Sequence, residues 1–143
     1  LQAMFQLDPS NQFHARVADR LKNEVVGWLT TVGANGVPQP NLVWFLWEGG
    51  DTLQIYSQDN HKVRNIARDA GVSFNLNSDD TGGDMIVLTG TAVIDNSQPA
   101  ADQNPTYLEK YASGIKGLGS TPAQFAAGYH VPIVVTITKL RGF

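Results

Sequence analysis

The chain has 143 residues, a formal net charge of −3 and no cysteine, with 42% hydrophobic and 16% charged residues. This length and composition are typical of one globular domain, residues 1–143, with a core of its own. They exclude disulfides and thiolate chemistry. They also argue against a nucleic-acid partner, because nucleic-acid-binding domains usually carry a basic surface. No apolar run reaches the length of a membrane span and no signal peptide pattern is present, so we predict a cytoplasmic protein without a membrane partner.

The first residues of the chain predict a helix and then a strand. We expect residues 1–7 to be a disordered N-terminal extension, in which residues 1–3 need not be native, because the chain begins with leucine. Asp8-Pro9 is typical of a helix start. Apolar residues follow at helical spacing, at Phe13, Val17 and Leu21. The helix should end near Glu24 and lead into a β-branched strand over Val25–Val32.

The segment Val37–Arg68 is the most informative part of the sequence. Asn35-Gly36, just before it, is a strong hairpin signal. The unbroken apolar run Leu42–Trp47 predicts a strand that is covered on both faces. A paired-glycine turn is expected at Glu48–Asp51, and a half-buried strand at Leu53–Tyr56. Asp59 or Asn60 can then cap a helix, which should end at Gly71.

Two basic residues, His61 and Lys62, fall in the first turn of the helix that follows this N-cap. The helix dipole favours carboxylates at that position and disfavours cations. A basic side chain beside free helix N–H groups is explained if an anion binds between them. The other interpretation is a solvated lysine at a small energetic cost, and the spacing alone does not separate the two.

The second half of the chain predicts three more strands and two short helices. The strands are expected over Val72–Leu76, over Met85–Ile94 with a bulge at Gly90, and over Pro132–Leu140. The helices are expected to start at Asn104-Pro105 and Thr121-Pro122, with a flexible loop over Ser113–Ser120 between them. Six strands, mostly in hairpin succession, predict a mainly β (α+β) fold, a six-stranded antiparallel barrel with Greek-key character.

The order of these motifs resembles the split β-barrel superfamily of pyridoxamine 5'-phosphate oxidase. The resemblance rests on the Trp-bearing first strand, the Val43-Trp44-Phe45 strand, the Tyr56-Ser57 strand end and the helix start Asn60-His61-Lys62-Val63-Arg64-Asn65-Ile66. The chain end is similar too, at Val135, Ile137, Lys139, Arg141, Gly142 and Phe143. Within the superfamily the sequence is most similar to the actinobacterial branch that uses the deazaflavin coenzyme F420.

The resemblance implies an FMN-binding split barrel type of fold and a homodimer with cofactor sites at the subunit interface. It places the phosphate end of the cofactor at Tyr56, Ser57, Gln58, His61, Lys62 and Asn65. It places the ring along Pro40, Asn41, Leu42, Val43 and Trp44. The chain departs from the FMN oxidases where Pro40-Asn41 replaces an arginine-bearing strand segment and His61-Lys62-Val63 replaces a Ser-Arg-Lys turn.

The resemblance therefore implies a coenzyme F420-dependent reductase that transfers a hydride between the deazaflavin and an unsaturated or carbonyl-like small molecule. The alternatives are an FMN-binding pyridoxamine 5'-phosphate oxidase-like enzyme, and a flavin or deazaflavin carrier or sensor without turnover. A barrel that binds single-stranded nucleic acid on aromatic residues is disfavoured by the acidic balance. No side chain in the sequence identifies itself as the catalytic acid.

Other candidate sites are weaker. The three histidines, His14, His61 and His130, have no paired spacing, so no metal site is predicted. Lys116 in the loop Ser113–Ser120 could lie near an anionic cofactor tail, although an ordinary surface loop is the simpler interpretation. Of the three tryptophans, only Trp44 falls where the resemblance places the ring.

Overall fold

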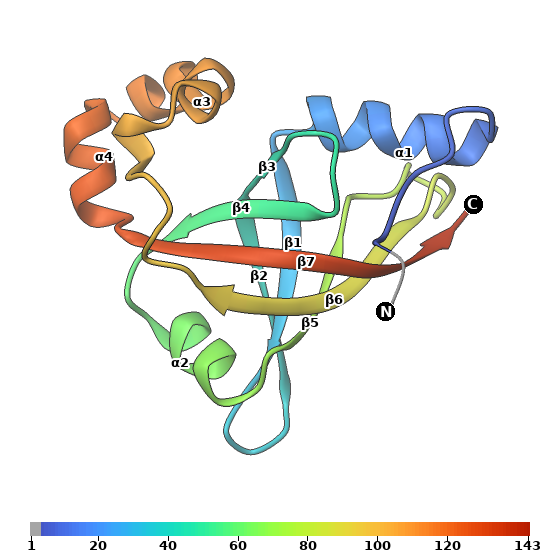
Figure 1. The fold of residues 1–143 in the computed structure, drawn as a ribbon, viewed down its shortest axis with the longest axis horizontal. Helices are drawn as coiled ribbons and strands as arrows, with labels where there is room; N and C mark the ends of the chain where they lie inside the picture. Colours follow the sequence, from blue (N-terminus) through green and yellow to red (C-terminus); the bar gives the residue numbers. More distant parts are fainter. Residues whose placement is uncertain (1–3) are drawn as a thin grey trace.

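In the computed structural model, residues 4–143 are described and form one antiparallel sheet with short helices around it (Figure 1). The helices are α1 (Gln12–Asn23), α2 (His61–Arg68), the 3-10 turn η1 (Ala101–Gln103), α3 (Pro105–Gly117) and α4 (Pro122–Gly128). The strands are β1 (Val26–Val32), β2 (Pro38–Trp44), β3 (Leu46–Trp47), β4 (Thr52–Ser57), β5 (Gly71–Asn75), β6 (Ile86–Ile94) and β7 (Val131–Gly142).

The sheet curls back on itself. Its strand order is β2-β1-β5-β6-β7-β4-β3, and all neighbouring strands are antiparallel. The two strands at the ends of this order, β2 and β3, are separated in the chain by Phe45 alone. Covalent continuity at Phe45 therefore brings the two ends of the sheet together, as in a split barrel. The predicted antiparallel, mainly β fold is confirmed.

The prediction of six strands is wrong, because the expected strand over Leu42–Trp47 is divided at Phe45. The N–H of Phe45 donates to Tyr111 Oη at 2.8 Å, and its carbonyl accepts from Lys110 Nζ at 2.9 Å. The Tyr111 hydroxyl also lies 2.7 Å from the carbonyl of Val25, to which it can donate. Side chains of α3 thus replace a strand neighbour at Phe45, and the ladder is interrupted there.

The N-terminal segment and α1 also differ from expectation. Asn11, not Asp8, caps α1, because its side chain accepts from the N–H of His14 at 3.1 Å. Phe5 and Leu7 pack against the core, so a disordered extension over residues 1–7 is not found at these two positions. Residues 1–3, predicted to be a possible non-native start, lie outside the described part of the chain.

Two later helices also end where the sequence did not place them. Helix α2 ends at Arg68, before Gly71, which already belongs to β5. Helix α3 continues to Gly117, so the flexible loop expected over Ser113–Ser120 is largely helical. Ile115, in the middle of that segment, is only 1% exposed, and its burial against the aromatic cluster explains why the segment with its glycines remains helical.

Two apolar clusters hold the fold together. The larger one fills the barrel, mainly with side chains from the strands, together with Val17 and Leu21 of α1 and Ile66 of α2. The smaller one packs the aromatic residues of α3 and α4 against Leu46 and Tyr56. The irregularity expected at Gly90 of β6 is confirmed by a shift in the pairing with β7, where Thr89 faces Lys139 and Gly90 faces Ile137, so that Thr138 is the extra residue. A Cβ at Gly90 would collide with the carbonyl oxygen of Thr136, which explains why glycine stands at the bend.

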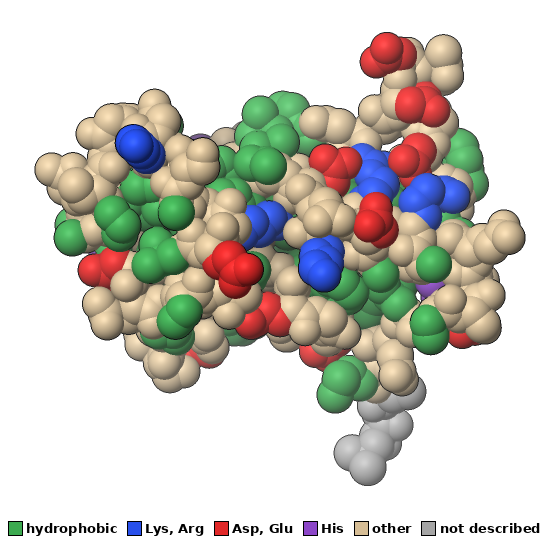
Figure 2. All heavy atoms as spheres, turned by 90° about the horizontal axis from the view of Figure 1, so that it is seen from above, with side chains coloured by type: hydrophobic (Ala, Val, Ile, Leu, Met, Phe, Trp, Pro, Cys, Tyr) green, Lys and Arg blue, Asp and Glu red, His purple; other side chains and the backbone are tan. Residues whose placement is uncertain are grey.

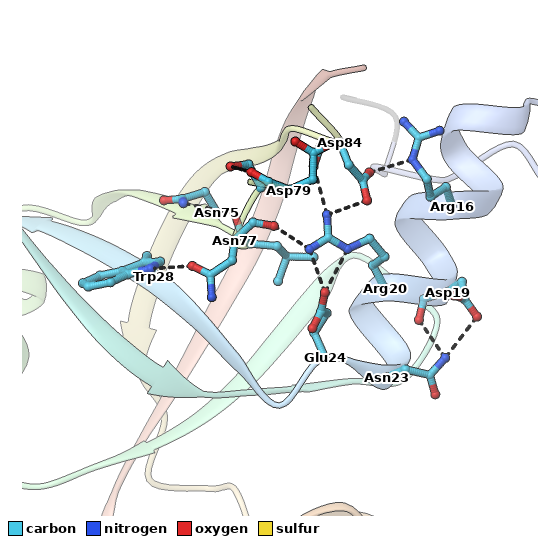
Figure 3. Close-up of polar contacts among 12 residues, drawn as sticks. Arg16, Asp19, Arg20, Asn23, Glu24, Trp28, Asn75, Asn77, Asp79 and Asp84 are labelled. Carbon is cyan, nitrogen blue, oxygen red and sulfur yellow. Dashed lines mark hydrogen bonds and ion pairs between the residues drawn. The ribbon is translucent and has the colours of Figure 1, made fainter. Parts of the chain in front are cut away.

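Arg20 ties α1 to the β5–β6 connection (Figure 3). Its guanidinium donates to Glu24 Oε1 at 2.6 Å and 2.9 Å and to the carbonyls of Asn77 and Asp84 at 2.6 Å and 2.9 Å. It also pairs with Asp84 Oδ2 at 3.1 Å, while its own side chain is only 13% exposed. Arg16 pairs with the same Asp84 from a more exposed position. On the face that carries α1 and α3, acidic and basic side chains are interspersed (Figure 2).

Candidate active site

A cavity of about 360 Å³ lies where the end of β2 meets the end of β4 and the start of α2. Its wall is completed by residues of α3 and α4, together with Leu118 just after α3 and Tyr129 just after α4. The wall consists of Asn41, Leu42, Val43, Trp44, Tyr56, Ser57, Gln58, Asn60, Lys62, Tyr107, Leu118, Phe125 and Tyr129. Apolar and aromatic side chains with a few converging polar groups are the usual lining of a ligand site.

Lys62 is the basic residue of this wall. Its side chain is 7% exposed, and Nζ donates to Ser57 Oγ at 3.0 Å. The three ion pairs found within residues 4–143 all involve Arg16 or Arg20, so Lys62 has no carboxylate partner there. Burial lowers the pKa of Lys62, because the charged amine loses water without gaining a counter-charge. An anion in the cavity would supply that counter-charge.

The turn between β4 and α2 holds Lys62 in place. Asn60 is the N-cap of α2, and its side chain accepts from the N–H of Lys62 at 3.2 Å. Ser57 is 2% exposed, and its hydroxyl donates to the carbonyl of Gln58 at 2.7 Å while it accepts from Lys62. The polar turn therefore directs an ammonium and a helix N-terminus to the same cavity.

The other side of the cavity is aromatic. The ring of Trp44 stacks on Tyr111 at a centroid distance of 4.7 Å and on Phe125 at 5.5 Å. Tyr129 stacks on Phe125 at 4.4 Å. At the rim, Leu42 and Leu118 are 54% and 60% exposed. A planar molecule could lie against these rings, with an anionic group at Lys62.

Tyr107 is the unusual member of the wall. It is completely buried, and its hydroxyl is the buried side-chain polar atom within residues 4–143 for which no hydrogen-bond partner is present. Its ring packs against Tyr56 and Tyr111, each at a centroid distance of 4.8 Å. Burial raises the pKa of Tyr107, and the neighbouring tyrosines raise it further. The hydroxyl therefore keeps its proton and remains a hydrogen-bond donor.

A model of the pyridoxamine 5'-phosphate oxidase family matches residues 13–141. The chain belongs to this family. Among solved structures, an F420 reductase is 28% identical, with 86% of this chain and 94% of that chain covered and a TM-score of 0.65. Rv2991 of Mycobacterium tuberculosis is 21% identical, with 98% and 88% covered and a TM-score of 0.69.

The same fold occurs in HutZ, a heme storage protein from Vibrio cholerae, at 14% identity, with 96% of this chain and 95% of that chain covered and a TM-score of 0.61. At such low identity, HutZ and Rv2991 show a shared fold and nothing about activity. A search of curated protein sequences gave no match. Membership of the oxidase family therefore agrees with the family resemblance seen in the sequence.

The structure gathers most residues that the family resemblance placed at the cofactor. Those in the cavity wall are Asn41, Leu42, Val43, Trp44, Tyr56, Ser57, Gln58 and Lys62. Pro40, His61 and Asn65 lie outside the wall. His61 Nε2 is 3.1 Å from Asn41 Oδ1, and Pro40 is exposed in register with Thr30 of β1.

Asn65 has a supporting role behind the wall. Its side-chain amide donates to Thr31 Oγ1 at 3.0 Å and to Gln39 Oε1 at 2.7 Å, and its oxygen accepts from Arg68 at 2.9 Å. All of its polar groups are therefore occupied within the protein. It fixes α2, and with it Lys62, against β1 and β2.

Five wall residues were not among the predicted site residues, namely Asn60, Tyr107, Leu118, Phe125 and Tyr129. Asn60 was identified only as a possible N-cap. The other four come from the segment between β6 and β7, where the sequence showed only short helices and a loop. Lys116 and Arg64, in contrast, are exposed and do not contribute to the wall. No local pattern identified the inward-facing aromatic residues, because aromatic residues on short helices are equally typical of a core.

A second cavity of about 670 Å³ lies between the end of α1, β3 and α3. Its wall carries charges of both signs, from Lys22, Glu48, Glu109 and Lys110. The ammonium of Lys110 lies 4.0 Å from the ring centroid of Phe45, in addition to its bond to the Phe45 carbonyl. The mixed charges select no ligand class, so we do not assign a function to this cavity.

We expect the stability of the protein to depend on pH through Lys110. Burial lowers the pKa of Lys110 from 10.5 to about 8, with Glu24 acting in the opposite direction. Between pH 8 and 10.5 the unfolded chain therefore binds more protons at this residue, and the free energy of unfolding should rise with pH. We expect Lys110→Met to remove this contribution. Denaturant titrations of both proteins across this range check it, and parallel pH profiles would contradict it.

Proposed function

We propose that the protein is a coenzyme F420-dependent reductase, in which the first cavity binds the deazaflavin. The observation that carries the proposal is the buried Lys62, which has no carboxylate partner within residues 4–143 and lies in the wall of an open cavity. The 28% identity to an F420 reductase over most of both chains supports the same cofactor class. The substrate would be an unsaturated or carbonyl-like small molecule.

The wall offers groups suited to both parts of such a cofactor. Ser57, Gln58 and Lys62 are placed to hold an anionic group at the start of α2. The β2 segment Asn41–Trp44 would support the planar ring, and Tyr107 contributes an unpaired hydrogen-bond donor. The donor set therefore fits a molecule with one anionic end and one planar, uncharged end.

The residues of this chain would bind and orient, while a bound deazaflavin supplies hydride transfer. Trp44, Phe125 and Tyr129 would exclude water from the reacting face, since their stacked rings form one apolar wall. Asn65 and Asn60 would keep Lys62 at its position through their bonds to neighbouring strands and to the helix backbone. No acidic or basic side chain of the wall is required to move a proton in this scheme.

The second candidate is the same fold with FMN as cofactor. The observation that favours it is that Lys62 is the single lysine or arginine in the described wall, since Arg64 and Lys116 are exposed outside it. One cation suits a compact phosphate as well as the end of a long anionic tail. A carrier without turnover is the third candidate, and the fold it shares with a heme storage protein shows that this architecture also occurs in a storage protein.

A competition experiment separates these candidates. We expect the purified protein to bind F420 more tightly than FMN when each is titrated and followed by fluorescence. The reduced complex should then react slowly with oxygen and reduce a quinone or enone. Tighter FMN binding with rapid hydrogen peroxide formation would instead assign an FMN oxidase. Tight cofactor binding without reduction of any acceptor would assign a carrier.

We also propose a homodimer whose interface includes β2. Within one chain, Val43, Phe45 and Leu46 of the run Leu42–Trp47 are buried, whereas Leu42 is not, so the strand is not covered on both faces at Leu42. Val37, just before β2, is 51% exposed, and Leu42, on β2, is 54% exposed. Strand β2 is one of the two end strands of the sheet. A second copy covering this edge would bury both side chains and close the cavity rim at Leu42.

Sedimentation at micromolar concentration tests the dimer. The wild-type protein should sediment as a dimer, and Leu42→Lys should shift it toward monomer because a charge would be buried at the contact. The exposed Val93, on β6 away from this edge, provides a control in Val93→Lys, which should leave the dimer intact. A wild-type protein that sediments only as a monomer would contradict the proposal.

A further inference from the structure

The hydroxyl of Tyr107 stands out from those of its neighbours. Tyr56 donates to the carbonyl of Pro99 at 2.7 Å, and Tyr111 bonds to the backbone of Phe45 and Val25. Tyr107 is as deeply buried as these two residues, yet its hydroxyl has no partner within residues 4–143. An unpaired buried hydroxyl destabilises a folded protein, because the group has lost water without replacing its hydrogen bond.

Packing does not explain why position 107 is tyrosine. The ring contacts are made with the rings of Tyr56, Tyr111 and Phe125, and a phenylalanine would make them equally well. In the free protein the hydroxyl therefore lowers the stability and makes no hydrogen bond. Tyr107 belongs to the cavity wall, while its hydroxyl has no accessible surface in the free protein, so a molecule in the cavity can supply the partner only when neighbouring wall side chains shift on binding.

The chemistry of that partner follows from its surroundings. The hydroxyl keeps its proton, so it acts as a neutral donor and calls for an acceptor. Aromatic rings pack against the Tyr107 ring, and a full negative charge would be poorly stabilised beside them. An anionic group has its counter-charge at Lys62 instead. An uncharged acceptor of the carbonyl type fits the environment of Tyr107.

We propose that the Tyr107 hydroxyl donates a hydrogen bond to a carbonyl oxygen of the molecule bound in this cavity and thereby fixes the orientation of its planar part. The inference rests on the proposed function, because the bound molecule is taken to be the cofactor or the substrate that accepts its hydride. The carbonyl can belong to the ring of the flavin or deazaflavin, or to the acceptor substrate. Tyr107 is a positioning residue if the first holds, and it binds substrate directly if the second holds.

The first measurement is the thermal stability of the free protein. Tyr107→Phe should leave the unfolding midpoint unchanged or raise it, because the variant loses an unpaired hydroxyl. Tyr111→Phe is the matched control, four residues along the same helix, with a hydroxyl that is bonded within the protein. Its midpoint should fall. A comparable fall for Tyr107→Phe would show that the hydroxyl has an internal partner, and that would overturn the proposal.

The second measurement is binding, with F420 and FMN as separate probes. If the ring supplies the carbonyl, Tyr107→Phe should weaken cofactor binding about three- to tenfold, as expected for one neutral hydrogen bond. The ring carbonyl stretch in the infrared difference spectrum should move to higher wavenumber. If the substrate supplies it, the cofactor affinity and this band should stay unchanged, and KM for the quinone menadione should rise while kcat changes less.

Failure of the proposed function is recognised separately. If the wild-type protein binds neither cofactor, the proposed function is wrong, and menadione alone is titrated by quenching of tryptophan fluorescence. Weaker menadione binding by Tyr107→Phe than by wild-type protein would still support the role of the hydroxyl. Unchanged affinities, carbonyl band and KM in Tyr107→Phe, whatever the cofactor, would overturn it.

Discussion

Replacing Lys62 by methionine is expected to weaken binding of an anionic cofactor by about 1.5–3 kcal/mol, or roughly ten- to 150-fold in the dissociation constant. The side chain keeps its length and loses the charge that would pair with the anion. Because Lys62 is buried without a carboxylate partner within residues 4–143, the free protein should become more stable in the same variant. The free energy of unfolding and the cofactor affinity should therefore change in opposite directions.

The pH dependence gives an independent check on Lys62. Burial lowers the pKa of its amine, and a bound anion favours the charged form, so binding takes up a proton once the pH exceeds the lowered pKa. The affinity of the wild-type protein should fall as pH rises through that region, and the affinity of Lys62→Met should not. Lys116→Met removes a lysine outside the cavity wall and serves as the control. Equal affinities of wild-type protein and Lys62→Met at low salt would refute the role of Lys62.

Replacing Arg20 by methionine is expected to destabilise the protein by about 2–4 kcal/mol, less than for a fully buried pair because Glu24 and Asp84 remain partly exposed. The guanidinium serves four acceptors, namely the carboxylates of Glu24 and Asp84 and the carbonyls of Asn77 and Asp84 (Figure 3). Its removal leaves them without this partner at the junction of α1 and the β5–β6 connection. Equilibrium unfolding in urea measures the loss.

Arg16 provides the comparison for this prediction. It pairs with the same carboxylate, that of Asp84, at 2.7 Å, but its side chain is 41% exposed. Arg16→Met should therefore cost less than about 1 kcal/mol, as is usual for an exposed ion pair. If the two variants were equally stable, the difference in burial would not determine the contribution of these arginines.

Local sequence patterns were sufficient for most of the strands and for the start of α2. Alternation, β-branched residues and turn glycines depend on neighbours within a few positions, so β1, β4 and β6 appear in the sequence with nearly the observed bounds. Asn60 was one of two possible N-caps for the same reason. The family resemblance placed Lys62 and the β2 segment at one site, and the cavity wall contains both.

The tertiary structure decided features that depend on residues far apart in the chain. The break at Phe45 arises because Tyr111 and Lys110, more than sixty residues later, take its backbone groups. The burial of Lys62 and the unpaired hydroxyl of Tyr107 have the same origin, since both depend on which elements close the cavity. Hydrogen bonding and desolvation between distant segments leave no periodic signal in the sequence. The sequence therefore determined most of the strands, the turn and the basic helix start, and only the packing of α3 and α4 decided which of their side chains line the cavity.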